Sequence, residues 1–220
     1  LEYAASLARG LKGMTEIVSE PNSTKVIDHS LATATYKEAL DPTYGGFKGA
    51  PKFMMPNTLE YLLHYESLKP SAEIYELLKT SLFRMGYGGI FDQIEGGFSR
   101  YSVDDRWHIP HFEKMAYDNA QLLGLYAEAY QYFNEPFFKD IVAKTASFTL
   151  SHFIDPESGG CFTAYDADSL NTEGILEEGA YYVFTKDELQ RQLKDDFEIF
   201  SLAFNVNDFG HWEKGNYVPI

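Results

Sequence analysis

Residues 85–121, MGYGGIFDQIEGGFSRYSVDDRWHIPHFEKMAYDNAQ, form a long connection between two segments of helical periodicity. The connection contains two pairs of glycines and a dense set of charged, histidine and aromatic side chains. A connection of this length without regular structure is uncommon in a compact domain unless it binds or covers something. The stretch therefore predicts the wall of a binding cleft carried by helices.

The glycine pair recurs in phase with the predicted helices. Each pair follows an aspartate, and the three copies are Asp41 with Gly45–Gly46, Asp92 with Gly96–Gly97, and Asp155 with Gly159–Gly160. Short turns at 69–71 and 134–136 separate the helices between the pairs. The repeat is therefore a helical hairpin followed by a long loop. All long loops should gather at one end of the hairpins, so the pattern predicts a mainly α protein, an α/α toroid with small β segments on one face.

The hairpins can be followed along the chain. Apolar residues at helical spacing predict a first helix that ends before Pro21; they are Leu1, Ala4, Ala5, Ala8, Leu11 and Met14. Asn22 or Ser23 can cap a second helix, which Asp41 and Pro42 end. A fourth hairpin is predicted to begin near Lys186 and to fade after Asn205. The toroid is then an open arc. Short strands are expected at 98–101 and at 180–184, the latter opposite 162–165.

Composition limits the partners and the compartment. The 220 residues include 33 acidic and 18 basic side chains, a formal charge of −15, which disfavours nucleic acid and anionic membranes. Cys161 is the only cysteine, which excludes an internal disulfide and a cysteine-based zinc site. No apolar run is long enough to span a bilayer, and the first residues lack the features of a signal peptide. These observations predict a cytoplasmic protein with no membrane partner.

Several segments together resemble the family of proteins similar to spermatogenesis-associated protein 20, whose members contain a thioredoxin-like domain. The resembling segments are DPTYGGFKGAPKF at 41–53, GGIFDQIEGGFSRYSVDDRWHIPHFEKMAYDNAQL at 88–122, GGCFTAYDADS at 159–169, EEGAYYVFTKDEL at 177–189 and GHWEKGN at 210–216. They extend over nearly the whole chain.

The resemblance implies a thioredoxin-like domain followed by a helical toroid of the six-hairpin glycosidase type, which is also similar to N-acylglucosamine 2-epimerases. Residues 1–220 resemble the first part of that toroid. We therefore expect a single helical-hairpin domain, a fragment that lacks the upstream thioredoxin-like domain and the closing hairpins. No redox activity carries over to it, and a sugar link rests on similarity of fold.

Glu113 is the first candidate for a general acid or base. It follows Pro110 at the expected start of a helix, on which Tyr117 and Gln121 share its face at four-residue steps.

Two neighbouring aromatic residues bear on the role of Glu113. Trp107 and Phe112 would surround it with apolar surface, and burial raises the pKa of a carboxyl group toward the range useful for proton transfer. The alternative is a glutamate in the first helical turn that complements the helix macrodipole.

His108 and His111 are the next candidates, because an imidazole beside a carboxylate suits proton transfer. Pro110 between them interrupts any helical face and no HExxH pattern accompanies them, so we expect no metal and no cofactor. Lys114 and Asp118 are four residues apart and either form an ion pair or contribute to the site.

Arg100 and Tyr101 are expected either to orient substrate oxygens or to pin the loop. Asp166 is expected to close a turn through backbone amides, whereas Asp168 remains a possible cleft residue. Aromatic rings could stack on sugars or belong to the core; these are Phe47, Phe53, Phe98, Tyr101, Trp107 and Tyr165. The predicted catalytic residues are Glu113, His111 and Asp118, and the predicted substrate-binding residues are Arg100, Tyr101, Trp107, His108, Phe98, Lys114, Tyr117 and Asp168.

Two main functions remain open, beside a third, a calcium-stabilised structural domain that would lose melting temperature on chelation. The first is a toroid that binds or modifies a sugar-like small molecule by epimerisation, isomerisation or hydrolysis. The second is a non-catalytic scaffold that binds a protein partner or serves an upstream thioredoxin-like domain. Convergence of the HFEKM residues on a pocket with unpaired polar atoms would favour the first, and a closed network among them would favour the second.

Overall fold

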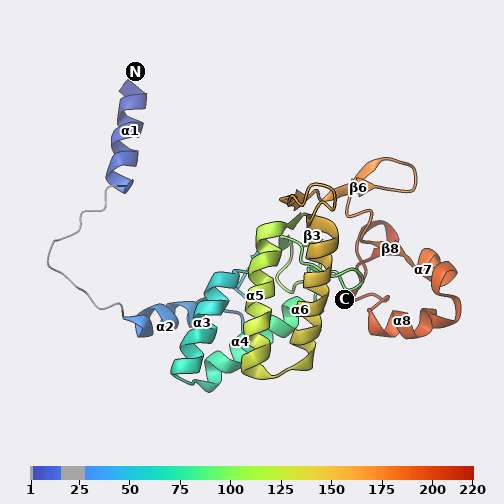
Figure 1. Ribbon diagram of the computed structural model, residues 1–220, viewed down its shortest axis with the longest axis horizontal. Helices are drawn as coiled ribbons and strands as arrows, with labels where there is room; N and C mark the ends of the chain where they lie inside the picture. Colours follow the sequence, from blue (N-terminus) through green and yellow to red (C-terminus); the bar gives the residue numbers. More distant parts are fainter. Residues whose placement is uncertain (1, 16–27) are drawn as a thin grey trace. The chain divides into compact units, whose positions relative to one another are not determined.

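The computed structural model describes residues 2–15 and 28–220 (Figure 1). It contains two compact units, residues 1–32 and 33–220. The first holds α1 (Glu2–Thr15). The predicted stop at Pro21 and the cap at Asn22 or Ser23 lie outside the described residues, as does Leu1. The helix α2 (His29–Ala39) ends where Asp41 and Pro42 predict.

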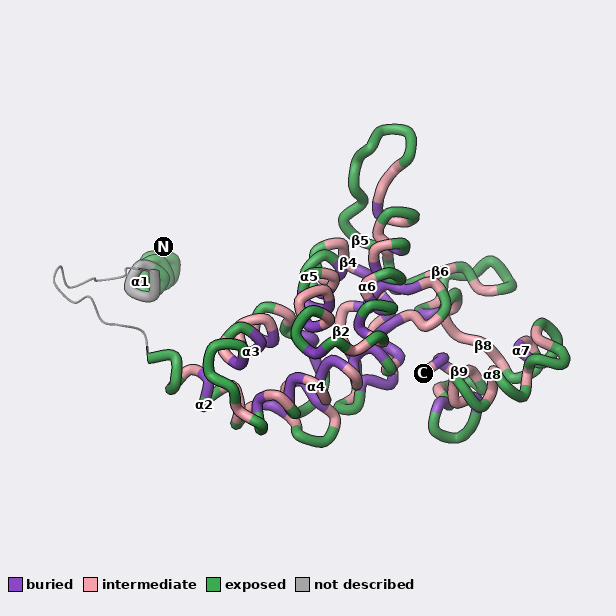
Figure 2. Tube along the Cα trace, turned by 60° about the horizontal axis from the view of Figure 1, so that its bottom comes forward, coloured by how far each residue is buried: buried purple, intermediate pink, exposed green. Residues whose placement is uncertain are grey.

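Two helical hairpins form the core of the second unit. They are α3 (Pro56–Leu68) with α4 (Ala72–Tyr87), and α5 (Ala116–Phe133) with α6 (Pro136–Phe148). α3 packs against both α4 and α5, and α5 packs against α6 (Figure 1). Buried residues gather where these helices face one another (Figure 2). The helical assignments and both short turns agree with the sequence pattern, because apolar side chains recur on the buried face of each helix.

Small antiparallel sheets tie the long loops together. One sheet contains β1 (Lys52–Phe53), β2 (Tyr101–Ser102) and β3 (Pro110–His111). The two-stranded sheets pair β4 (Lys114–Met115) with β5 (Ala164–Tyr165), β6 (Asp168–Leu170) with β7 (Leu176–Glu178), and β8 (Phe184–Thr185) with β9 (Asn216–Tyr217). The strands β1, β4 and β8 each lie shortly before a helix and pair with a strand of the following loop, so the long loops share one face.

This arrangement corrects one prediction. The segment 162–165 does not pair with 180–184, because its strand β5 pairs with β4 and β8 pairs with β9. The strand before each helix pairs with a strand of the loop that follows the hairpin. Alternation of apolar residues within one loop does not identify a pairing partner in another loop.

The aspartate–glycine motif builds the same turn in the first and second loops. In the first, the Asp41 Oδ1 atom accepts hydrogen bonds from the amides of Thr43 and Tyr44 at 2.8 and 3.0 Å. The buried Lys52 Nζ atom donates to Asp41 Oδ2 at 3.0 Å and to the carbonyl of Gly45 at 2.9 Å. The buried lysine therefore holds the turn by binding its aspartate and a glycine carbonyl; we call this arrangement a lysine lock.

The second loop repeats this lock. Lys114 Nζ donates to Asp92 Oδ2 at 2.9 Å and to the carbonyl of Gly96 at 3.0 Å. The predicted pair between Lys114 and Asp118 is therefore wrong, since Lys114 lies in β4 before the helix and its ammonium group binds the Asp92 carboxylate and the Gly96 carbonyl of the second loop. In the third loop, Asp155 binds the amides of Glu157 and Ser158, and no lysine reaches it among the described residues.

Glycine is required in the first two turns, where an aromatic ring packs directly on the backbone. Gly46 has a φ of 63°, and a Cβ atom there would lie 2.3 Å from the ring of Trp107. Gly97 has a φ of 79°, and its Cβ would lie 2.4 Å from the ring of Phe148. The glycine pairs thus combine left-handed backbone with a close aromatic contact. The third loop is uncovered, and its residues 156–164 are exposed (Figure 2).

The predicted fourth hairpin is present and short. It contains α7 (Lys186–Leu193), capped by reciprocal hydrogen bonds between Thr185 and Glu188, and α8 (Phe197–Ala203). Single-turn segments are η1 (Thr149–Phe153), η2 (Lys194–Asp196) and η3 (Glu213–Gly215). Among the described helices, none combines the length and the apolar character that a bilayer crossing needs.

Candidate functional site

An aromatic row crosses the three-stranded sheet on the long-loop face. The strand register places Phe53 opposite Tyr101, and Tyr101 opposite His111. The ring centroids of Phe53 and Tyr101 lie 4.9 Å apart, as do those of Tyr101 and His111. Phe53 remains 43% exposed. The row therefore offers a stacking surface that is partly exposed to solvent through Phe53. Phe53 was one of several aromatic residues that the sequence suggested for stacking.

An arginine and a glutamate pair beside this row. Arg100 Nη1 donates to Glu113 Oε2 at 2.9 Å, and the Arg100 amide donates to the Glu113 carbonyl at 2.9 Å. This hydrogen bond raises the pKa of the Arg100 guanidinium. The helix begins only at Ala116, so the prediction that Glu113 stands in the first helical turn is wrong. Residues 110–111 and 114–115 form short strands because they pair with neighbouring loops, and Glu113 lies in the connection between them.

Asp118, in the first turn of α5, is the unpartnered polar group of this region. Its Oδ2 atom is buried and makes no hydrogen bond. Burial raises the pKa of Asp118 to about 6, an effect that the Arg100 charge opposes and the Glu113 charge reinforces. Asp118 lines a cavity of about 230 Å³ together with Arg100, Gln121 and residues 53–58. The arrangement places a carboxyl group that is partly protonated near neutral pH beside a fixed cation.

His111 and Tyr117 are not among the residues that line this cavity. His111 Nδ1 lies 2.9 Å from Glu178 Oε1, and His111 Nε2 lies 4.0 Å from Glu113 Oε2. His111 therefore links the second loop to β7. Tyr117 is 49% exposed in the first turn of α5. The structure thus brings Arg100, Tyr101, His111, Glu113 and Asp118 together through β2, β3 and α5.

Two predicted stacking residues belong to the core. Phe98 and Trp107 have no exposed surface. Phe98 packs against Phe91 and Tyr126, and the indole nitrogen of Trp107 donates to the Tyr44 carbonyl at 2.8 Å. Neither ring therefore offers a face to a ligand.

The structure does not give Glu113 the apolar surroundings that the sequence predicts. Phe112 lies in a separate cluster with Tyr182 and Trp212, and Trp107 packs in the main core. The side chains next to Glu113 are instead Arg100 and His111. The position of Glu113 is set by charge and strand pairing.

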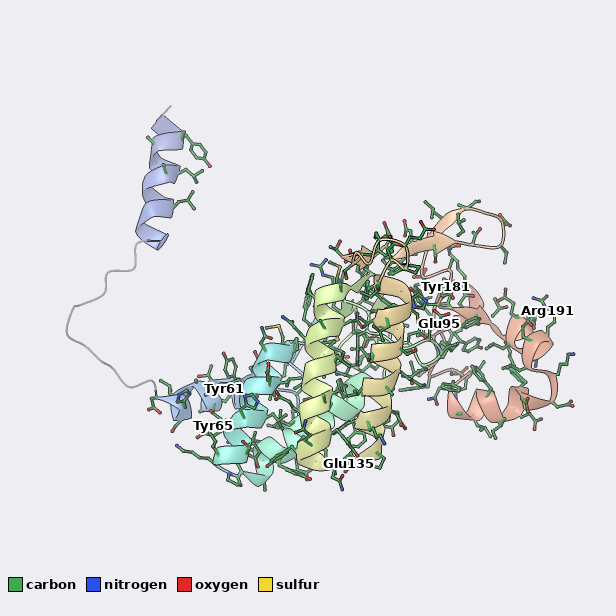
Figure 3. All side chains as sticks on the ribbon, viewed as in Figure 1. Tyr61, Tyr65, Glu95, Glu135, Tyr181 and Arg191 are labelled. Atoms are coloured by element: carbon green, nitrogen blue, oxygen red, sulfur yellow. The ribbon has the colours of Figure 1, made fainter. Side chains whose placement is uncertain are left out.

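Other sequence candidates lie in different surroundings. Lys114 and Tyr182 line a second cavity of about 200 Å³ where the third loop meets the second. There the Tyr181 hydroxyl donates to Glu95 Oε1 at 2.8 Å (Figure 3). Asp166 accepts the amide of Asp168, as predicted for a turn residue, and Asp168 itself is exposed in β6.

The histidines share no metal cluster in the part of the chain that is described. His108 is buried against Phe209, whereas His111 contacts Glu178. The single group of potential metal ligands among the described residues is Glu60, His64 and Glu128, whose ligand atoms all lie within 4.8 Å of one another on α3 and α5. His64 is exposed, Glu60 and Glu128 are half-buried, and none of the three is a sequence-predicted site residue.

The charge state of Asp118 makes a testable prediction about stability. Because its pKa is raised in the folded protein, the fold loses stability as pH rises from about 4 through about 6. Asp118→Asn should therefore raise the free energy of unfolding at pH 7.5, by about 1 kcal/mol after allowance for solvent screening, and have little effect at pH 4. Urea denaturation at both pH values measures this, with the exposed Asp105→Asn as control. Equal effects at both pH values would contradict the assignment.

Comparisons with known proteins give three findings. No family model matches the chain. The chain is 41% identical over 166 residues to spermatogenesis-associated protein 20 of Mus musculus, covering 72% of this chain and 20% of that protein. It is 38% identical over 192 residues to the Homo sapiens protein of the same name, covering 83% and 24%. The chain thus spans about a quarter or less of the length of these relatives.

Sugar epimerases are the other similar proteins. The chain is 24% identical over 138 residues to cellobiose 2-epimerase of Bacteroides fragilis, covering 62% of this chain and 35% of the enzyme. The structure of cellobiose 2-epimerase from Spirochaeta thermophila superposes with a TM-score of 0.56 at 17% identity, covering 73% and 40%. A sugar epimerase from a ruminal bacterium gives 0.55 at 13%, covering 81% and 52%. These structures establish the toroid fold.

Proposed function

Because the chain belongs to the spermatogenesis-associated protein 20 family and has the fold of helical epimerase toroids, we propose that its long-loop face binds a sugar or sugar derivative. The proposed site is the cavity bounded by Phe53, Arg100, Asp118 and Gln121. A neutral polyhydroxylated ligand suits this surface because the chain carries a charge of −15 and the cavity offers both acceptors and a donor.

The unpartnered Asp118 Oδ2 atom carries the proposal. A buried polar atom without a hydrogen bond costs free energy, so such atoms are uncommon in native proteins unless a ligand, an ion or water satisfies them. A sugar hydroxyl donates one hydrogen bond and accepts others, and can therefore contact Asp118 and Arg100 together.

The aromatic row supplies the apolar part of the site. Sugar rings present C–H faces that pack on aromatic side chains. Phe53 lines the cavity and provides such a surface together with the neighbouring ring of Tyr101. Binding would place the ring against these side chains and its hydroxyl groups toward the charged residues.

In this proposal Asp118 transfers protons, because a carboxyl group with a pKa of about 6 exchanges between acid and base near neutral pH. Arg100, fixed by Glu113, orients a hydroxyl or carbonyl oxygen of the ligand. His111 holds the strand β3 against β7 through Glu178. The reaction class is acid/base chemistry on a sugar, namely epimerisation, isomerisation or hydrolysis.

A ligand-binding experiment tests the site. We expect disaccharides or monosaccharides to raise the melting temperature of the chain, because a ligand at 100 times its Kd stabilises the folded state by about 2.7 kcal/mol. Asp118→Asn and Glu113→Gln should abolish the shift. Glu198→Gln, an exposed glutamate on α8, is the matched control and should retain it.

The alternative function that we propose is a non-catalytic scaffold that binds a protein partner or serves an upstream thioredoxin-like domain. Its supporting observation is the pair of lysine locks, which use Lys52 and Lys114 to hold loops rather than ligands. Absence of any sugar-dependent shift, both in this chain and in a longer chain that includes the remaining hairpins, would contradict the sugar proposal and favour the scaffold. The domain assignment of residues 1–220 as the first part of the toroid belongs to the same proposal.

A further inference from the structure

A third cavity, of about 260 Å³, lies between the end of α4, the second loop and the C-terminal segment. Its lining contains no carboxylate side chain, although the chain carries 33 acidic residues. Two of the five arginines of the chain, Arg84 and Arg106, lie at this cavity instead. The larger side chains of the lining include Arg84, Tyr87, Arg106, His108, Asn205 and Phe209. The side chains of this lining thus carry a positive charge, opposite to that of the whole protein, and the α-carboxyl group of Ile220, whose oxygen accepts from Asn205, lies in the same lining.

Both guanidinium groups are held by stacking and not by ion pairs. Arg84 lies over the ring of Tyr44 at 5.8 Å, and Arg106 lies over the ring of Phe209 at 5.5 Å. Neither has a carboxylate within ion-pair distance among the described residues. Stacking uses the face of a guanidinium and leaves the N–H groups at its edge free to donate.

A buried histidine adds a third polar group. His108 is 4% exposed, its ring is parallel to that of Phe209 with centroids 6.0 Å apart, and its Nε2 atom has no hydrogen-bond partner. Burial lowers the pKa of His108, against the opposing effect of the Gly210 carbonyl, so the imidazole is neutral at pH 7. A neutral imidazole has one donor and one acceptor nitrogen. Because Nε2 is unpartnered, the nitrogen that interacts with the Gly210 carbonyl is Nδ1, so Nε2 is the acceptor and can receive a hydrogen bond from a hydroxyl group in the cavity.

Hydrogen bonds compensate part of the negative charge at the end of α4. The last carbonyl groups of a helix carry partial negative charge. At the end of α4, Gln93 of the second loop donates from Nε2 to the carbonyls of Gly86 and Gly88 at 2.9 and 3.2 Å. The Gly88 amide donates to the Arg84 carbonyl at 3.0 Å. These oxygens are therefore satisfied, and the Asn205 amide nitrogen similarly binds the Ile220 carbonyl at 2.9 Å.

We propose that the cavity of Arg84, Arg106 and His108 binds a phosphate group, either as the free ion or as a phosphate monoester. Arginine edges match the oxygens of phosphate in a planar, two-point geometry, and the unpaired Nε2 atom of the neutral imidazole can accept a hydrogen bond from a P–OH group. This site is separate from the cavity of Asp118, and it would stand if sugar binding there failed.

Calorimetric titration with inorganic phosphate tests the site on the whole chain. The ionic strength is held constant with sodium chloride, because simple screening of a −15 protein would otherwise mimic binding. We expect saturable binding at one site per chain. Arg84→Gln and Arg106→Gln should each weaken it by tenfold or more, since each removes a charge-assisted hydrogen-bond donor. Both side chains are exposed, so circular dichroism should show unchanged folding.

Arg191→Gln is the matched control, because Arg191 projects from α7 and does not line the cavity (Figure 3). It should bind phosphate as the unaltered chain does. Tighter binding of glucose 6-phosphate than of phosphate, lost in the same two variants, would identify a monoester as the ligand. Equal affinities would identify the free ion. No saturable binding, or equal weakening by Arg191→Gln, would overturn the proposal.

Discussion

Trp107→Ala is expected to lower the free energy of unfolding by about 3–5 kcal/mol, because it removes a fully buried indole from the main core. The ring packs against Gly46 of the first loop, and its nitrogen donates to the Tyr44 carbonyl. The substitution would leave a cavity between two loops and an unsatisfied carbonyl. Loss of the loop contact should also loosen the aromatic row, which the same loops support.

Urea denaturation followed by far-ultraviolet circular dichroism measures this loss. Trp107→Phe should recover part of the stability because it refills most of the volume. Trp212→Ala is the matched tryptophan control, since Trp212 is only partly buried in the smaller cluster and should cost less. A Trp107→Ala protein of normal stability that had lost only ligand binding would contradict the core assignment and restore the stacking role that the sequence suggested.

Lys114→Met is expected to destabilise the fold by a similar amount, about 3–5 kcal/mol, because it leaves the Asp92 carboxylate in a mostly buried place without its cation. The lysine side chain is 1% exposed and that of Asp92 is 12% exposed. Lys114 Nζ also lies 4.2 Å from the ring centroid of Phe148 and 4.7 Å from that of Tyr182, and both contacts would be lost. The second loop should therefore come away from β4.

A double-mutant cycle separates the charge from the packing. Lys114→Met combined with Asp92→Asn should be less destabilised than the sum of the two single variants, since the unpaired carboxylate is then absent. Lys214→Met, which breaks the exposed pair of Lys214 with Glu177, is the control and should change stability little. Additive effects of the two single variants would show that Lys114 and Asp92 act independently, contrary to the structure.

Much of the fold could be predicted from sequence. The three glycine pairs in phase with helical segments predicted the hairpins α3–α4 and α5–α6, their short turns and the shared long-loop face, and these are present in the described residues. The turn of the hairpin predicted from the first two helices lies outside the described residues. Local signals suffice for these features because helical periodicity and left-handed glycines depend on residues close in sequence. Arg100, Glu113 and Asp118 were named as a group because they lie within nineteen residues of one another.

The lysine locks could not be predicted in the same way. Asp41 and Lys52 are 11 residues apart, whereas Asp92 and Lys114 are 22 apart, so no fixed spacing marks the pair. The second loop contains the additional strands β2 and β3, which lengthen the path between aspartate and lysine. Only the folded loops show that both lysines reach the same place in the repeated turn.

The sequence by itself determined the helical hairpins, their repeat and the segment that carries the candidate site, because each depends on the local spacing of apolar, glycine and turn residues. Tertiary structure alone decided which of the clustered side chains are available to a ligand. Trp107 and Phe98 became core, Lys114 became a lock, and Asp118 kept a buried oxygen without a partner. The physical reason is that burial and pairing depend on contacts between loops far apart in sequence, and these contacts set both the exposure of a ring and the pKa of a carboxyl group.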